Sequence, residues 1–130
     1  MSMHLIYVAG PYRGPDRAAI VRNIAGARAV AIHAAEQGWF PVCPHLNTAH
    51  MEEDLPFPDD YWLAGTMLLM EQCAAVVLVP GWQNSTGTLA EVARAKQLGI
   101  PVFTNHKVLC FADEFRAPAT PTSRPAPGSR

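Results

Sequence analysis

The sequence predicts an α/β fold, a flavodoxin- or Rossmann-like three-layer arrangement around a parallel sheet of four to five strands. Short apolar runs rich in β-branched residues alternate with longer segments of helical periodicity, which is typical of β-α-β units. The run over residues 74–79 is apolar throughout, as expected for a strand buried on both faces of a parallel sheet. Because crossovers between parallel strands are right-handed, we expect the strand order 2-1-3-4.

Local signals place each element in turn. Residues 4–9 form a first strand that ends at Gly10, and Asp16 can cap a helix over about residues 17–37. Pro41 lies inside the second strand, residues 39–43, and favours an edge position because proline cannot donate to a ladder. A surface loop at 44–58 follows, and then a helix at 59–72 whose core-facing residues are Trp62, Met67, Leu69 and Met70. After the strand at 74–79, Gly87 opens a helix whose apolar side is formed by Leu89, Val92, Ala93 and Leu98. The last element is a strand at 100–104.

Composition limits the classes of protein and partner. A chain of 130 residues is expected to hold one domain, residues 1–116, followed by a Pro/Ser/Thr-rich tail over 117–130 that we expect to be disordered. The net charge of −1 argues against a nucleic-acid partner, and the lack of any apolar stretch of about 18 residues argues against a membrane. Cys43, Cys73 and Cys110 form no CxxC pair, which favours reduced thiols and a cytoplasmic protein.

Polar residues follow three strands at the point where each strand ends. They are Gly10, Tyr12, Arg13 and Gly14 after the first strand, His45 and Asn47 after the second, and Ser85, Gly87 and Glu91 after the third. Asp60 joins them, because the helix that leads into the third strand begins at the same edge. Ligands of open α/β sheets bind outside the carboxyl ends of the strands, so we expect one ligand crevice there.

The pattern Ser85-x-Gly87-x-x-x-Glu91 has two interpretations. Ser85 and the free amides of the first helical turn can hold an oxyanion, while Gly87 allows close approach and Glu91 lies one turn further. Alternatively, Ser85 only caps the helix and Glu91 is a solvated residue favoured by the helix dipole.

Three segments resemble the nucleoside 2-deoxyribosyltransferase-like superfamily: IYVAGPYRG (6–14), PVCPHLN (41–47) and CAAVVLVPGWQNSTGTLAE (73–91). The resemblance implies cleavage or transfer at the N-glycosidic bond of a nucleoside or nucleotide. It assigns Glu91 as the catalytic glutamate and Tyr7 as the tyrosine that orients it; Tyr7 could also be a simple core residue. Because relatives complete their sites with groups from a neighbouring chain, we expect a homo-oligomer, most simply a dimer through the apolar helix surfaces of Trp62 and Met70.

The sequence departs from the superfamily pattern at two positions. Met67 and Ala75 stand where aspartates are usual, so the acid of the superfamily cannot be carried over. Asp60 is the candidate replacement, with helix capping as the alternative role. His45 could act on the base, or be a loop histidine that binds water.

The spacing of Cys43, His45 and His50 matches no zinc pattern, so we expect no metal site. The dinucleotide motif GxGxxG and the phosphate-binding motif GxxxxGK are also absent from the sequence, so we expect no cofactor.

The leading functional hypothesis is hydrolysis of a nucleoside 5′-monophosphate to free base and (deoxy)ribose 5-phosphate. Members that act on unphosphorylated nucleosides resemble one another in carrying an aspartate where this sequence has Ser85. A nucleoside 2-deoxyribosyltransferase is one alternative. Another is a phosphoribohydrolase that releases cytokinin bases, whose motif PGG-x-GT-x-x-E is similar to Pro80-Gly81 and Gly87 to Glu91, although extra residues separate the halves here. A catalytically silent nucleotide sensor is the third, motivated by Met67.

Overall fold

Four parallel strands form the central sheet in the order β2-β1-β3-β4. The computed structural model describes residues 3–118. The strands are β1 (Leu5–Ala9), β2 (Phe40–Val42), β3 (Ala75–Leu78) and β4 (Val102–Phe103). Tyr7 of β1 pairs with Val42 on one side and Val76 on the other. The predicted strand order is confirmed, and β2 with its Pro41 lies at an edge as expected.

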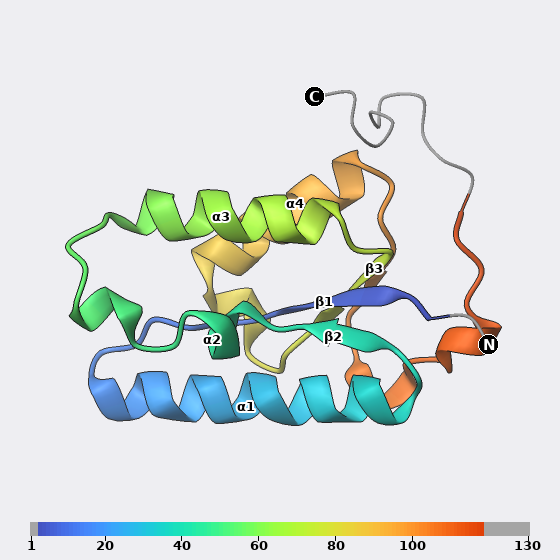
Figure 1. The fold of residues 1–130 in the computed structure, drawn as a ribbon, viewed down its shortest axis with the longest axis horizontal. Coiled ribbons are helices and arrows are strands. Elements are labelled where there is room, and N and C mark those ends of the chain that lie inside the picture. Colours follow the sequence, from blue (N-terminus) through green and yellow to red (C-terminus); the bar gives the residue numbers. More distant parts are fainter. Residues whose placement is uncertain (1–2, 119–130) are drawn as a thin grey trace.

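Helices cover both faces of this sheet, as the three-layer prediction requires. Helix α1 (Arg17–Glu36) lies along one face, and helices α3 (Asp59–Glu71) and α4 (Thr86–Gln97) lie along the other (Figure 1). The α1 side is packed by Ile6, Val8, Ala27, Val30, Ala31, Ala34, Trp39, Ala75, Val77 and Val79. The opposite side is packed by Tyr7, Ala9, Met70, Cys73, Val76, Leu78, Val92, Ala95, Leu98 and Ile100. Alternate residues of β1 and β3 therefore enter different cores.

The segment between β2 and α3 is more regular than a surface loop. Residues Pro44–Asn47 form a short helix α2, and Met51–Glu53 form a 3₁₀ turn η1. Proline at the first helical position favours this start, because its fixed φ suits a helix. Further 3₁₀ turns are η2 (Trp82–Asn84), η3 (His106–Val108) and η4 (Ala112–Glu114). Most of the predicted disordered tail, residues 119–130, lies outside the described residues.

The inward faces of α3 and α4 differ in part from the prediction. Met70 is fully buried as expected, but Leu69 is 40% exposed. On α4, Val92 is buried and Leu89 is 44% exposed, because Thr88 and Glu91 take inward positions instead. Two polar side chains on the core-facing side of α4 point to a site at that place rather than to packing alone.

Candidate active site

A cavity of about 500 Å³ lies where the predicted polar clusters converge. Of the residues predicted to form the site, the ones that line it are Tyr7, Tyr12, Arg13, His45, Asp60, Ser85, Gly87 and Glu91. They come from β1 and the segment after it, from α2, from the first turn of α3, and from the capping residue and first half of α4. The volume falls within the range of small-molecule sites, and the location is the one that parallel α/β sheets use for ligands.

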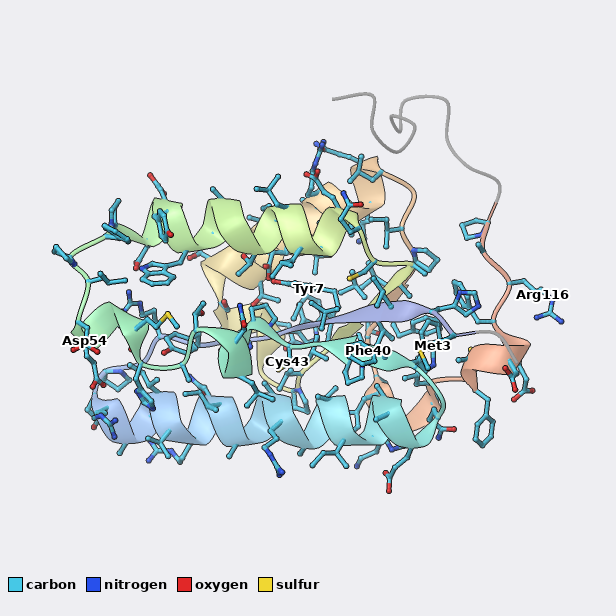
Figure 2. All side chains as sticks on the ribbon, in the orientation of Figure 1. Met3, Tyr7, Phe40, Cys43, Asp54 and Arg116 are labelled. Carbon is cyan, nitrogen blue, oxygen red and sulfur yellow. The ribbon has the colours of Figure 1, made fainter. Side chains whose placement is uncertain are left out.

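Tyr7 and Glu91 form a buried pair in this cavity. Tyr7 points away from α1, because its neighbours Ile6 and Val8 take the α1 face of β1. Its side chain therefore lies between the sheet and the layer of α3 and α4 (Figure 2). The Tyr7 hydroxyl donates to the Glu91 Oε2 atom across 2.5 Å, and the two residues are only 1% and 6% exposed. Tyr7 thus belongs to the core and also holds the carboxylate of Glu91.

Burial and hydrogen bonding act in opposite directions on Glu91. Burial raises the pKa of the Glu91 carboxyl, because a charged group loses its hydration, while the hydroxyls of Tyr7 and Thr66 counter that rise. Burial, together with the nearby Glu91 charge, holds the pKa of Tyr7 far above its usual range, so the phenol keeps its proton and remains a donor. The site therefore presents a poorly hydrated carboxylate held in place by neutral donors.

Ser85 caps the helix that carries Glu91. Its Oγ accepts from the Thr88 amide at 3.2 Å and from the Thr88 hydroxyl at 2.9 Å. Both bonds use the oxygen of Ser85, so its own hydroxyl hydrogen remains free to donate to a ligand. The amides of Thr86 and Gly87 have no acceptor within the helix, and both residues line the cavity. The capping role of Ser85 is therefore confirmed, and the first-turn amides that it does not cap belong to residues that line the cavity.

The charges around the cavity are mostly acidic. Among the described residues that line it, carboxylates come from Glu52, Asp59, Asp60 and Glu91, against the guanidinium of Arg13. Arg13 pairs with Asp59 at 2.9 Å, and both side chains are largely exposed. Such an exposed pair contributes little stability, so Arg13 can exchange Asp59 for a ligand at low cost. Asp60 is exposed in the first turn of α3, where the capping position is occupied by Pro58.

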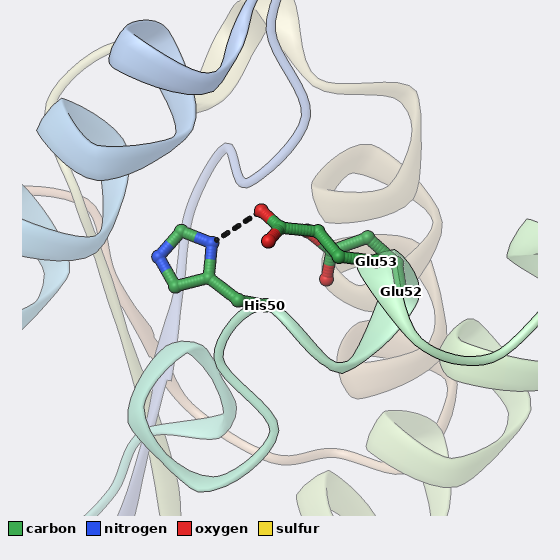
Figure 3. A group of neighbouring side chains, drawn as sticks. All are labelled: His50, Glu52 and Glu53. Atoms are coloured by element: carbon green, nitrogen blue, oxygen red, sulfur yellow. Dashed lines mark hydrogen bonds and ion pairs between the residues drawn. The ribbon is translucent and has the colours of Figure 1, made fainter.

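A hydrogen-bonded group fastens the segment between β2 and α3 to the segment after β1. The Tyr12 hydroxyl donates to the Glu52 Oε1 atom at 2.7 Å and accepts from the His50 amide at 2.8 Å. Figure 3 shows His50, Glu52 and Glu53 side by side, with the His50 ring bonded to Glu53 at 3.1 Å. Glu53 also pairs with Arg17 at 2.8 Å.

The ligand atoms of His50, Glu52 and Glu53 lie within 4.8 Å of one another, a spacing that could hold a metal ion. Each of the three side chains already has a hydrogen-bond partner. We therefore assign these residues to loop anchoring.

Three of the predicted site residues do not line the cavity. A Cβ at Gly10 would lie 2.5 Å from the Cβ of Val79, and a Cβ at Gly14 would lie 2.5 Å from that of Ala19. These two glycines therefore allow close packing of the chain after β1. Asn47 is exposed at the end of α2.

The sequence interpretation missed Thr66 and gave Glu52 and Trp62 no role in the site, yet all three line the cavity. For Thr66 a signal existed. Trp62, Thr66 and Met70 are spaced four residues apart on α3, so Thr66 is a polar residue within the inward stripe. The Thr66 hydroxyl lies within reach of Tyr7 and Glu91 and also donates to the Leu63 carbonyl at 3.1 Å.

The fold and the cavity place the chain in the class of doubly wound α/β proteins with a ligand crevice at the carboxyl edge of the sheet. Within that class, the chain belongs to the family described as a domain of unknown function, DUF7768, whose sequence profile matches residues 4–105. No curated protein and no solved structure is significantly similar to it. Within residues 3–118, no helix combines the length and the apolar character needed to cross a membrane.

Proposed function

We propose that the protein is a nucleotide N-glycosidase, related to the nucleoside 2-deoxyribosyltransferase-like superfamily. It would hydrolyse a nucleoside 5′-monophosphate to the free base and (deoxy)ribose 5-phosphate. The observation that supports this most is the buried hydrogen bond between Tyr7 and Glu91 in a cavity large enough for a small molecule. A carboxylate that is desolvated and held by a neutral phenol is suited to a cationic transition state.

Glycosidic cleavage develops positive charge on the sugar ring and its anomeric carbon. Glu91 would stabilise that charge, or attack the anomeric carbon while the bond to the base breaks. In the second case, water then cleaves the glycosyl ester, which restores the carboxylate and releases the sugar phosphate. Tyr7 stays protonated throughout, and its hydrogen bond keeps the Glu91 oxygens in one orientation.

The departing base needs a proton or a hydrogen bond. Asp60 is the candidate acid, because it lines the cavity and no carboxylate is available at Met67, which packs against the core. His45 is less suited to protonate the base. Burial lowers its pKa, so the ring is neutral near pH 7, and its Nε2 atom lies 2.9 Å from the Pro11 carbonyl oxygen, to which it must donate.

The phosphate is expected at the amino end of α4. The Ser85 hydroxyl and the amides of Thr86 and Gly87 can donate to it, and the helix dipole adds partial positive charge. Arg13 can leave its exposed pair with Asp59 and supply a bidentate contact. An anion would have to avoid the acidic side of the cavity, which restricts it to this end.

A catalytically silent nucleotide sensor is a second candidate, and the partly buried Met67 in place of an acid favours it. One experiment separates the two candidates. Base release is measured for a panel of nucleoside monophosphates, and binding of the same panel is measured by calorimetry. Turnover supports the glycosidase, and added free base as acceptor would reveal a deoxyribosyltransferase. Binding without release of base would support the sensor.

We also propose a cytoplasmic homo-oligomer. Of the two side chains predicted to form the contact, Met70 is fully buried and unavailable. Instead, α3 exposes Tyr61, Leu68 and Leu69, whose exposed fractions are 53%, 60% and 40%. Large apolar side chains gathered on one helix are typical of a contact surface.

A further inference from the structure

Three side chains that line the cavity hold polar atoms that are shielded from solvent and have no hydrogen-bond partner within residues 3–118. They are the Glu52 Oε2 atom, the His45 Nδ1 atom and the Trp62 Nε1 atom. A buried polar atom without a partner costs folding free energy, and such atoms are uncommon in native proteins. Their occurrence together in one cavity suggests that a ligand completes them.

The hydrogen-bonding character of each atom follows from its surroundings. The Glu52 Oε1 atom is already bonded to the Tyr12 hydroxyl, so Oε2 remains as an acceptor. The His45 Nε2 atom must carry the hydrogen because it faces the Pro11 carbonyl oxygen, which leaves Nδ1 as an acceptor. The Trp62 indole nitrogen can only donate. The side chains that line the cavity thus hold two acceptors and one donor without partners among the described residues, each just below the solvent-exposed surface.

The two acceptors belong to residues that both contact Tyr12. Tyr12 bonds to Glu52, and its ring meets the His45 ring edge-on with centroids 5.7 Å apart. The terminal torsion of a glutamate is soft, so a small rotation of Glu52 turns its free oxygen toward the cavity. If α4 holds the phosphate and Glu91 the sugar, these groups are left for the base.

We propose, resting on the function proposed above, that the protein selects nucleotides whose base carries an exocyclic amino group. Two acceptors need two N–H hydrogens, and the amino group of cytosine, adenine or guanine supplies them. Uracil and hypoxanthine have a single N–H beside a carbonyl oxygen, and a carbonyl that faces the Glu52 carboxylate is repelled. Trp62 can donate to a ring nitrogen or carbonyl of the same base.

The test compares matched nucleotide pairs that differ at the amino position. Binding of CMP against UMP, and of AMP against IMP, is measured by calorimetry on the wild type and on Glu91→Gln, which removes turnover. We expect the amino member of each pair to bind at least about tenfold more tightly. In Glu52→Gln an amide donor replaces the free acceptor, so the preference should vanish or reverse. Glu53→Gln is the matched control: its side chain bonds to Arg17 and does not line the cavity, so the preference should persist.

Each alternative result has a defined meaning. Equal binding within both pairs overturns the inference, and base release from those nucleotides would still support the proposed function. If the protein binds nucleotides with amino bases more tightly but releases no base, the inference about base selection stands and the proposed hydrolase activity is contradicted. If Glu52→Gln instead changes the ratio between CMP and 2′-deoxy-CMP, Glu52 contacts the sugar and the inference is wrong. Tyr12→Phe is a second variant for the case in which Glu52→Gln does not fold. It removes the hydroxyl that holds Glu52 in place, so it should weaken the preference for amino bases.

Discussion

Tyr7 of β1 and Glu91 of α4 are separated by 84 positions in the chain, yet their side chains share a buried hydrogen bond. The phenol donates and keeps its proton, because burial and the adjacent carboxylate hold its pKa far above the usual range. Glu91 is the partner whose charge can change, since its raised pKa lies closer to neutrality than that of an exposed glutamate. Two predictions depend on this pair directly.

Glu91→Gln should abolish base release, with a loss of at least about a thousandfold in kcat, because the variant keeps the shape and removes the charge. The fold should not be weakened. A buried carboxylate whose pKa is raised costs stability above the normal glutamate pKa, so the variant should unfold at a higher temperature than the wild type at pH 7. That difference should shrink as the pH falls through the raised pKa of Glu91 and disappear below the ordinary glutamate pKa of 4.5, where the carboxyl is neutral in both the folded and the unfolded protein. Near-normal turnover in the variant would remove Glu91 from the mechanism.

Tyr7→Phe should move the acid limb of the pH–rate profile to higher pH. The Glu91 carboxyl must be ionised to act, and the Tyr7 hydrogen bond opposes the rise of its pKa that burial causes. Without that bond the pKa rises further, so activity is lost at a higher pH as the solution is acidified. The measurement is kcat/KM for one nucleotide across the acid range. An unchanged acid limb with a uniformly lower rate would show that Tyr7 only packs.

Thr66→Val should shift the acid limb in the same direction, because the valine keeps the shape but cannot donate to Glu91. Thr66 lowers the Glu91 pKa less than Tyr7 does, and its hydroxyl also donates to the Leu63 carbonyl, so the shift should be smaller than for Tyr7→Phe. Thr66→Ser is the matched control, since it retains the donor and should retain the wild-type limb. A serine variant that behaves like the valine variant would rule out the hydroxyl as the cause.

The parts of the fold that follow from backbone rules could be predicted from the sequence. The apolar run at 74–79 and the right-handed crossovers were enough for the strand order, and Pro41 was enough for the edge strand. The position of Ser85 and Glu91 after the third strand, together with the sheet topology, was enough to place them beside one cavity. These features depend on neighbours in sequence or on topology, which a single chain displays.

The side-chain detail of the cavity wall could not be predicted. Glu52 and Glu53 are adjacent acids in a polar segment, and only the 3₁₀ turn η1 directs one to the cavity and the other to Arg17. Leu69 looked like a core residue, because α3 is apolar on more than one side and periodicity alone does not show which side meets the sheet. Such choices depend on tertiary contacts between distant segments.

Leu68→Glu should convert an oligomer into monomers. Leu68 is 60% exposed on α3, and a two-fold contact through this helix would place the new charges of both chains close together. Val108→Glu is the matched control, because Val108 is 75% exposed in η3, a turn that contacts α1 instead. Light scattering at working concentration measures the mass. A monomeric wild type would contradict the proposed oligomer.

The final prediction concerns the 5′ end of the substrate. A nucleotide should be hydrolysed with a kcat/KM at least about a hundredfold above that of its dephosphorylated nucleoside, because two charge-assisted hydrogen bonds contribute roughly 3 kcal/mol. Ser85→Asp tests whether phosphate binding at the amino end of α4 causes this preference. Aspartate caps a helix as well as serine does, so the Thr88 amide keeps its partner and α4 should remain intact.

The new carboxylate of Ser85→Asp would repel the phosphate and accept from a 5′-hydroxyl, so the preference should move toward the nucleoside. Arg13→Ala should lower the preference as well, because it removes the guanidinium of the cavity wall. Arg17→Ala should not, since Arg17 pairs with Glu53 and does not line the cavity. Equal kcat/KM for nucleotide and nucleoside in the wild type would mean that the amino end of α4 does not hold a phosphate. The acidic wall of the cavity would then indicate an uncharged nucleoside as the substrate.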